Sequence, residues 1–344
     1  MKTLRDISWW VSEPEYRADP ALSYSTLSRF AREGFNNLDT LFDNIDTPSL
    51  TFGSAVDALI TGGQEEFDNN FLVAEFPTAT ESIEKMVKAL FEECGQAYNS
   101  LNDIPDSAII DKSNELKYQL NWKPETRAKV VKEQGGELYK LLYIANGRKV
   151  VHALFKEDVD MCVNALRTSP ATSKYFNDLD DGLERAYQLK FKATLDGVDY
   201  RCMADLIVVD HQNKIVYPID LKTSSHAEWD FYESFVQWRY DLQARLYWRI
   251  IRDNMDRDEQ FKDYKLDNYR FVVVNRKTLT PLVWQFGATK AIGTLHFGKE
   301  GQIEFQDPFE LGRQLSIYLS SRPPVPTGIE MVEDNNIIEW LNKK

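Results

Sequence analysis

The chain has 344 residues, enough to bury the core of one large domain or two ordinary ones without disulfides or a structural metal. Hydrophobic residues make up 43% of it and charged residues 28%, a composition that excludes a mainly disordered chain. The net charge of −13 at pH 7 repels nucleic acid at long range. A surface that binds phosphate groups must therefore be a local basic patch or carry metal ions.

Cysteines and apolar segments bear on cellular location. The three cysteines, Cys94, Cys162 and Cys202, are odd in number and far apart, which favours a reducing compartment over a disulfide framework or a four-thiolate metal site. No stretch reaches the roughly 18 apolar residues of a membrane span, and charges follow Met1 before an apolar run can develop. We predict a cytoplasmic protein without a membrane partner.

The predicted elements change in kind near residue 180. Helical periodicity dominates from about 25 to 175, with short breaks at Gly62-Gly63 and Gly135-Gly136. After Asp180-Asp181-Gly182 the apolar residues recur at every second position. This pattern predicts a hairpin turn at Asp196-Gly197, one long helix over 229–252, and strands over 185–193, 198–209, 215–223, 269–275 and 282–286.

These elements predict an α/β protein in which a mixed central sheet is flanked by helices and preceded by a helical N-terminal region. We expect residues 1–180 to form the mainly helical part and residues 181–344 the core sheet with its long helix. The two parts are expected to pack as one unit. A proline-rich break follows at Arg322-Pro323-Pro324-Val325-Pro326.

The tripeptide Asp220-Leu221-Lys222, at the end of the third strand, is the first candidate for chemistry. Alternate residues of a strand share a face, so the carboxylate and the ammonium project to the same side. A carboxylate can hold a divalent cation and a lysine can orient water, which suits phosphodiester hydrolysis. The same spacing recurs at Asp263-Tyr264-Lys265 and Glu115-Leu116-Lys117, so the tripeptide alone is weak evidence. We expect Lys222 to be exposed and to contribute little to stability.

A second carboxylate, Asp205, makes the pattern more specific. If the loop between the second and third strands is symmetric, with Asp210 opposite Ile215, then Asp205 stands opposite Asp220. Like charges in opposed positions destabilise a sheet unless a cation lies between them. The alternative is that both charges occupy solvent-exposed strand positions. We favour a shared metal site.

Five segments between about residue 20 and residue 250 resemble, in order, the motifs of the RecB-like branch of the PD-(D/E)XK nucleases. The closest resemblance is to RecE-type, exodeoxyribonuclease VIII-like exonucleases. The segments are Leu22-Ser23-Tyr24-Ser25-Thr26-Leu27-Ser28-Arg29-Phe30, Phe52-Gly53-Ser54-Ala55-Val56-Asp57-Ala58-Leu59, Arg201-Cys202-Met203-Ala204-Asp205-Leu206, Ile219-Asp220-Leu221-Lys222-Thr223 and Gln243-Ala244-Arg245-Leu246-Tyr247. Single motifs are unspecific, but five in the family's order are a strong indication.

The resemblance implies a restriction-endonuclease-like core with a site for Mg²⁺ or Mn²⁺. At the matching positions Asp205 and Asp220 are metal ligands, and the Leu221 carbonyl is a further ligand. Lys222 positions or activates water. One position departs from the family, because Asp57 stands where histidine is usual. Aspartate also binds hard cations, so Asp57 is a candidate metal ligand, with an exposed helix charge as the alternative.

The resemblance also assigns supporting residues. Gln243 and Tyr247 lie one helical turn apart. At these positions the family has residues that contact DNA or hold active-site residues in position. Tyr247 can equally be a core residue, whereas the Gln243 amide on an apolar helix face needs a partner. Glu184 matches, less closely, an acidic residue before the first strand. Local positive potential for DNA is expected from the basic residues Lys123, Arg127, Lys129, Lys132, Arg239 and Arg245.

The function implied is that of an exonuclease that processes duplex DNA ends in recombination or phage DNA metabolism, in a bacterial or phage-infected bacterial cell. A recombination partner protein and a homo-oligomer are expected with it. The alternative is a catalytically impaired module that keeps the fold and binds DNA ends or a partner. Iron–sulfur relatives are excluded because they need four clustered cysteines. An acid–base hydrolase is disfavoured because Lys222 would keep both carboxylates ionised.

If Asp57 shares an ion with Asp205 and Asp220, its replacement should change metal preference. Asp57→His keeps a ligand but removes a negative charge, so we expect activity to remain and to shift toward manganese. Asp57→Ala should lose more activity. The measurement is cleavage rate against the concentration of each metal. Identical curves for the wild type and both variants would make Asp57 a surface charge.

Overall fold

The computed structural model describes residues 2–34, 38, 40–43, 45–177, 181–290, 293–297 and 301–321. Contacts divide the chain into two compact units, one of Met1–Gly53 with Asn164–Lys344 and one of Ser54–Val163. This division does not follow the change of periodicity at residue 180. Across the described ranges, helices that combine the length and the apolar character needed to cross a membrane are absent. The predicted break at residues 322–326 lies outside them.

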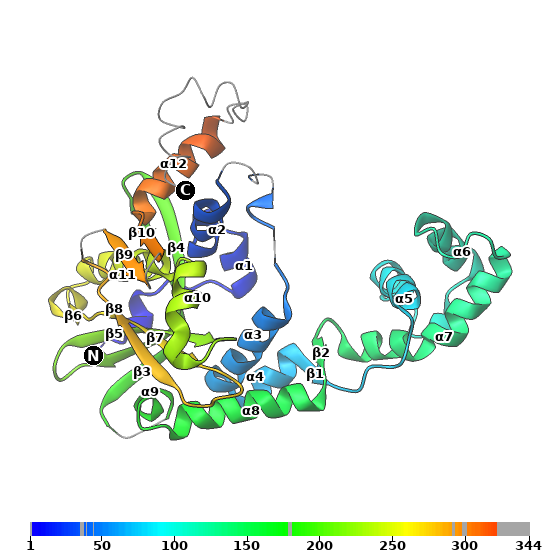
Figure 1. The fold of residues 1–344 in the computed structure, drawn as a ribbon, viewed down its shortest axis with the longest axis horizontal. Helices are drawn as coiled ribbons and strands as arrows, with labels where there is room; N and C mark the ends of the chain where they lie inside the picture. The colour runs from blue at the N-terminus through cyan, green and yellow to red at the C-terminus, as the bar shows by residue number, and fades with distance from the viewer. Residues whose placement is uncertain are drawn as a thin grey trace. The chain divides into compact units, whose positions relative to one another are not determined.

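The first unit is built on a mixed sheet with strand order β3-β4-β5-β7-β8 (Figure 1). Neighbouring strands are antiparallel except β5 and β7, which are parallel, and short β6 also pairs with β5 in parallel. The predicted mixed α/β fold class is confirmed. The strands are β3 Leu183–Leu195, β4 Val198–Asp210, β5 Ile215–Thr223, β6 Lys265–Leu266, β7 Tyr269–Val274 and β8 Leu282–Phe286, with a separate antiparallel pair of β9 Thr294–Phe297 and β10 Gly301–Glu304.

The two hairpins of the sheet have the predicted turns and register. Asp196 and Gly197 both have positive φ, 51° and 80°, which is the backbone of a two-residue hairpin turn. Between β4 and β5 the pairs run from Asp210 with Ile215 to Leu206 with Ile219. The register assumed from a symmetric loop is therefore confirmed. Asp205 and Asp220 are the next residues beyond the last pair.

Helices of the first unit cover this sheet. The central one is α11 Tyr240–Asp256, which packs against β3, β4, α2 and α12. Its buried face contributes Leu242, Leu246, Ile250 and Ile251 to the core, at helical spacing. The remaining helical segments of this unit are η1 Leu4–Ile7, α1 Glu13–Ala18, α2 Tyr24–Glu33, α9 Ser173–Phe176, η4 Glu228–Asp230, α10 Phe231–Gln237, η5 Phe261–Asp263 and α12 Pro308–Ser321.

The single helix predicted over 229–252 is wrong at one point. The chain forms η4 and α10, leaves the helix at Trp238, and resumes as α11 at Tyr240. Arg239 at the junction is left-handed, with φ 58° and ψ 46°, and its guanidinium donates to both oxygens of Asp241 at 3.0 Å. Apolar periodicity continues through both helices, so it cannot reveal a break made by one residue held in place by its side chain.

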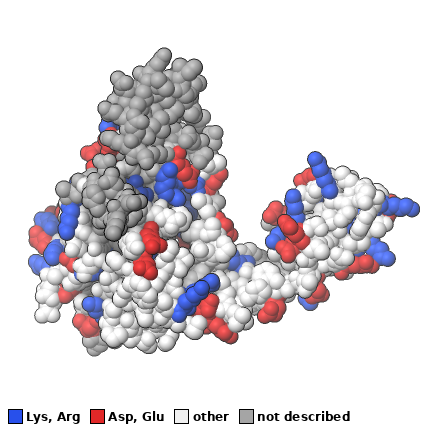
Figure 2. Space-filling view, viewed as in Figure 1, with Lys and Arg blue, Asp and Glu red and all other residues white. Residues whose placement is uncertain are grey.

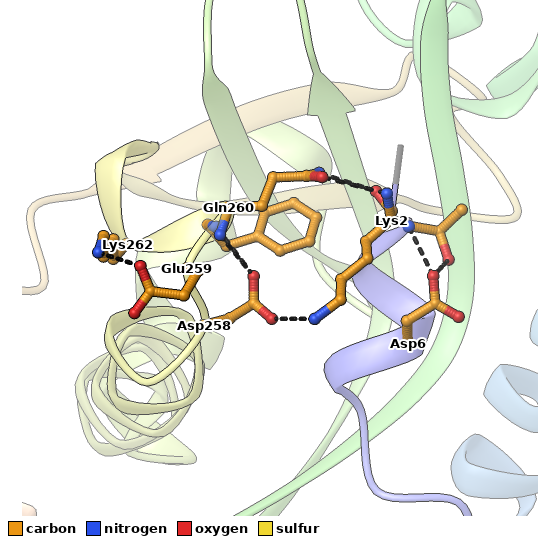
Figure 3. Close-up of polar contacts among 8 residues, drawn as sticks. Lys2, Asp6, Asp258, Glu259, Gln260 and Lys262 are labelled. Carbon is orange, nitrogen blue, oxygen red and sulfur yellow. Dashed lines mark hydrogen bonds and ion pairs between the residues drawn. The ribbon is translucent and has the colours of Figure 1, made fainter.

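The start of the chain is tied to the segment after α11 (Figure 3). Lys2 Nζ lies 2.8 Å from Asp258 Oδ2, and the Lys2 backbone exchanges two hydrogen bonds with the Gln260 side chain. Asp258 Oδ1 in turn accepts from the Gln260 backbone N–H. These contacts join residues about 256 positions apart and hold the start of the chain, just before η1, against the segment that follows α11.

The second unit is mainly helical and has its own core. A short parallel pair, β1 Phe71–Val73 with β2 Lys149–Val151, accompanies the helices. The predicted break at Gly135-Gly136 is wrong, because both glycines lie inside α7, and a Cβ at Gly135 would clash with Val87 of α5. The helical segments are α3 Pro48–Thr61, which begins in the first unit, α4 Gly63–Asn70, α5 Glu81–Cys94, η3 Leu101–Asp103, α6 Asp106–Glu115, α7 Pro124–Ala145 and α8 Ala153–Thr168, which ends in the first unit.

The buried Glu228 carboxylate should carry much of the stability around the end of β7. It is fully buried and accepts hydrogen bonds from the backbone N–H groups of Asn275 and Thr280, at 3.0 and 2.9 Å, and from the Thr278 hydroxyl. Glu228→Ala leaves these donors without an acceptor, so we expect the free energy of unfolding in urea to fall by about 3 kcal/mol. Glu233→Ala, on the exposed side of α10, is the control. Equal stability of the two variants would contradict the prediction.

Candidate active site

The predicted strand-end residues converge around the Asp220 carboxylate. Asp220 lies on β5, between β4 and β7, and is only 1% exposed. Its Oδ1 accepts a hydrogen bond of 2.5 Å from Gln243 Nε2, and its Oδ2 lies 2.7 Å from Lys222 Nζ. A carboxylate this deeply buried is costly unless it is compensated, and here both oxygens face donors.

Asp205 meets the same place from β4. Its Oδ2 accepts a hydrogen bond of 2.9 Å from the backbone N–H of Leu221, between Asp220 and Lys222. The side chain of Asp205 thus continues the contact between the strands one position beyond the last backbone pair. The structure brings together Asp205, Asp220 and Lys222, as the register argument expected.

Lys222 is less exposed than the sequence suggested. Its side chain is 19% exposed, and its Nζ lies 4.6 Å from the centre of the Tyr240 ring. Burial acts to lower the pKa of Lys222, but the negative charge of Asp220, with contributions from Tyr240 and Asp205, outweighs it and raises the pKa. Lys222 therefore stays protonated at neutral pH. The expectation of an exposed lysine is wrong, because the ammonium lies against the buried Asp220 carboxylate. The small effect on stability expected from exposure no longer follows, and it is tested below.

Gln243 and Tyr247 project from α11 toward the same strands. Gln243 is 3% exposed, and the partner that its amide required is Asp220. With Nε2 on that carboxylate, Gln243 Oε1 is buried and accepts no hydrogen bond from any residue that the structure describes. Tyr247 packs in the core, 6.3 Å from Tyr269 between ring centres, and burial raises its pKa well above the ordinary value. Its predicted supporting role stays a prediction.

Several other candidates lie elsewhere. Glu184 pairs with Val209, four positions along β4 from Asp205, and its carboxylate contacts His211 at 2.8 Å. The basic residues Arg127, Arg239 and Arg245 are at most 8% exposed and hold neighbouring polar groups instead of facing solvent. Figure 2 shows positive and negative side chains interspersed on the drawn face in small groups. The remaining predicted residues are not buried: Lys123 and Lys129 are exposed, and Lys132 pairs with Asp106 at 2.6 Å. Their contribution to DNA binding stays a prediction.

Asp57, the departure from the family, lies on α3 in the second unit, one helical turn after Gly53. Its role as a metal ligand stays a prediction. Gly53 belongs to the first unit and comes close to the end of β5, since a Cβ there would lie 3.2 Å from Thr223 Oγ1. Any larger residue at this position would press on the strand that carries Asp220 and Lys222.

The residues around Asp220 suit a hard divalent cation. Asp205, Asp220 and backbone carbonyl groups offer oxygen ligands, which Mg²⁺ and Mn²⁺ prefer. Gln243 Oε1, on the amide that donates to Asp220, is buried without a hydrogen-bond partner among the described residues and would be able to accept a hydrogen bond from water. Over the described ranges, three or more histidine, cysteine, aspartate or glutamate side chains are nowhere grouped tightly enough to hold an ion by themselves. Water and backbone ligands would have to complete the coordination.

Sequence reasoning missed two tyrosines beside the site. Tyr240 lies under the Lys222 ammonium, and the Tyr24 ring lies 6.1 Å from the Tyr240 ring. Tyr24 belongs to the first of the five motif segments, so the segment was recognised but no role was assigned to this residue. Tyr240 is the first residue of α11, directly after the helix break that the sequence did not predict. Periodicity alone therefore gave no indication that its ring faces Lys222.

Comparison with known proteins adds little to this geometry. The sequence matches no protein-family model and no curated protein. Among solved structures, a protein from Eubacterium rectale described as a putative exonuclease matches with a TM-score of 0.41 and 13% sequence identity, over 91% of this chain and 85% of that chain. A likeness at this level supports no conclusion about fold or function. The candidate site is therefore defined by its own residues.

Because Lys222 neutralises the buried Asp220 carboxylate, we expect the stability of a variant without this lysine to depend on metal ions. A lysine whose pKa is raised on folding stabilises the folded state below its unfolded pKa of about 10.5, so the pair is intact at pH 7. Lys222→Met leaves the buried carboxylate without its counter-charge. In EDTA we expect the variant to lose about 3 kcal/mol of stability to urea unfolding.

Magnesium or manganese should then stabilise Lys222→Met more than it stabilises the wild type, because the cation replaces the missing charge. Lys265→Met serves as the control, since its ammonium is paired with Asp267 at 3.0 Å but its side chain is 68% exposed. We expect this control to unfold like the wild type in EDTA. Wild-type stability of Lys222→Met in EDTA would show that Lys222 does not compensate Asp220.

Proposed function

We propose that the protein is a metal-dependent deoxyribonuclease that hydrolyses phosphodiester bonds. The observation that supports this most is the buried Asp220 carboxylate, held between the Lys222 ammonium and the Gln243 amide, with Asp205 at the adjoining strand end. Hard oxygen ligands beside a fixed positive charge suit the binding of a phosphate group and the activation of water. The order of the five motif segments supports the same activity.

In this proposal Asp205, Asp220 and the Leu221 carbonyl would hold Mg²⁺ or Mn²⁺. The ion would lower the pKa of bound water and neutralise charge on the phosphate oxygens. Lys222, whose pKa is raised, is protonated at neutral pH and so serves as a donor and counter-charge rather than as a general base. Gln243 keeps Asp220 in place through Nε2, while its Oε1 can accept a hydrogen bond from water.

The finer assignment rests on the resemblance to RecE-type enzymes. It is an exonuclease that acts on duplex DNA ends in recombination or phage DNA metabolism, as a homo-oligomer and with a recombination partner protein. A cytoplasmic location in a bacterial or phage-infected cell belongs to the same proposal. The presence of Asp205, Asp220 and Lys222 in one place favours an active enzyme over a catalytically impaired binding module.

The test is digestion of an end-labelled linear duplex and of a closed circular plasmid, with Mg²⁺ or Mn²⁺ and with EDTA. We expect metal-dependent loss of the linear duplex and resistance of the closed circle. Asp220→Asn should lower the rate by about 10²-fold or more, because it removes a ligand charge without changing the side chain's size.

Asp263→Asn, in the tripeptide of the same spacing that begins at the last residue of η5, is the matched control and should cleave like the wild type. Circular dichroism of each variant verifies its fold. Absence of cleavage by folded wild type with either metal would refute the proposed activity. Cleavage by Asp220→Asn at the wild-type rate would remove Asp220 from the mechanism.

A further inference from the structure

An exposed tryptophan and an exposed arginine lie side by side near the proposed active site. Trp238 occupies the break between α10 and α11 and is 41% exposed. The guanidinium of Arg32, at the last turn of α2, lies 5.0 Å from the centre of the Trp238 ring. Arg32 itself is exposed, and its Nε donates to the Ser28 carbonyl at 3.1 Å. We call Arg32 and Trp238 the Arg–Trp pair.

Direct contacts connect this pair to the reactive carboxylate. The Tyr24 hydroxyl donates to the Trp238 carbonyl at 2.7 Å, and the Tyr24 ring lies against the Tyr240 ring. Tyr240 in turn lies under Lys222, which pairs with Asp220. A continuous chain of contacts therefore joins the Arg–Trp pair to Asp220.

The backbone that presents Trp238 is held in a costly conformation. Arg239, the next residue, is left-handed although it is not glycine, a conformation that persists only when its surroundings enforce it. They do so here, since the Arg239 guanidinium is bound by both oxygens of Asp241 and by Gln306 Oε1 at 2.8 Å. An uninterrupted helix would remove this cost. The break instead leaves a large aromatic side chain facing solvent.

We propose that the Arg–Trp pair binds the DNA strand next to the reacting phosphate, with the Trp238 indole stacked on a nucleobase and Arg32 paired with a backbone phosphate. The inference rests on the proposed nuclease function. An aromatic ring beside a guanidinium is the combination that binds nucleic-acid strands without sequence preference. With Arg127, Arg239 and Arg245 turned inward, Arg32 supplies exposed positive charge that a protein of net charge −13 needs near the site.

The test compares Arg32→Gln, Trp238→Ala and Trp238→Phe with the wild type. Binding of a fluorescently labelled duplex is measured in EDTA by anisotropy at several salt concentrations, and cleavage kinetics are measured with Mg²⁺ or Mn²⁺. Arg32→Gln should weaken binding about tenfold and reduce the slope of log K against log salt by about one. Trp238→Ala should weaken binding about tenfold at an unchanged salt slope, and Trp238→Phe should retain most of the affinity. In each case KM should rise more than kcat falls.

Arg17→Gln and Trp10→Ala are the controls, because both residues are exposed on the N-terminal segments. If the wild type binds DNA and neither Arg32→Gln nor Trp238→Ala changes affinity, the inference is overturned, whatever the cleavage result. A fall in kcat at unchanged KM and affinity would also overturn it, since that outcome indicates disturbance of Tyr240 and Lys222. Wild-type protein that neither binds nor cleaves DNA refutes the proposed function itself. Trp238→Phe keeps the test valid if Trp238→Ala unfolds.

Discussion

The charge of Asp220, buried at the centre of a sheet, is the constraint on which the rest of the site depends. A carboxylate with 1% exposure is stable only if its environment supplies compensating donors, and these come from Lys222 on the same strand and Gln243 on α11. The requirement fixes α11 against the strands and draws the lysine inward. It also explains why Lys222 lies over the Tyr240 ring and does not extend into solvent.

Under the proposed function, the same arrangement would make the site responsive to cations. In the structure an ammonium occupies the place beside Asp220 Oδ2 that a metal ion would contest, and Asp205 is held nearby by a backbone N–H. In the proposed reaction, substrate phosphate would bring further negative charge, which the protonated lysine would help to balance. The strongly acidic protein would then bind DNA by concentrating its positive charge at a few positions.

The break between α10 and α11 shows how a local irregularity can serve a site. Arg239 holds its left-handed backbone through Asp241 and Gln306, so the turn is enforced by side-chain contacts. The break sets the start of α11, and with it the positions of Tyr240 and Gln243. It also exposes Trp238 next to Arg32. One strained residue therefore influences both the carboxylate's partner and the neighbouring surface.

The sequence by itself determined the five long strands of the main sheet, the Asp196-Gly197 turn, the register that brings Asp205 toward Asp220, and the need of Gln243 for a polar partner. These follow from short-range rules, since strand periodicity and turn chemistry depend on neighbouring residues. Only the tertiary structure decided that Lys222 is half-buried, that Arg127, Arg239 and Arg245 face inward, and that Gly135 lies inside a helix. The physical reason is that the burial of a charged side chain depends on what distant parts of the chain pack over it, such as Tyr240 over Lys222 and the Ala288 and Lys290 carbonyls at Arg245, and periodicity carries no information about that packing.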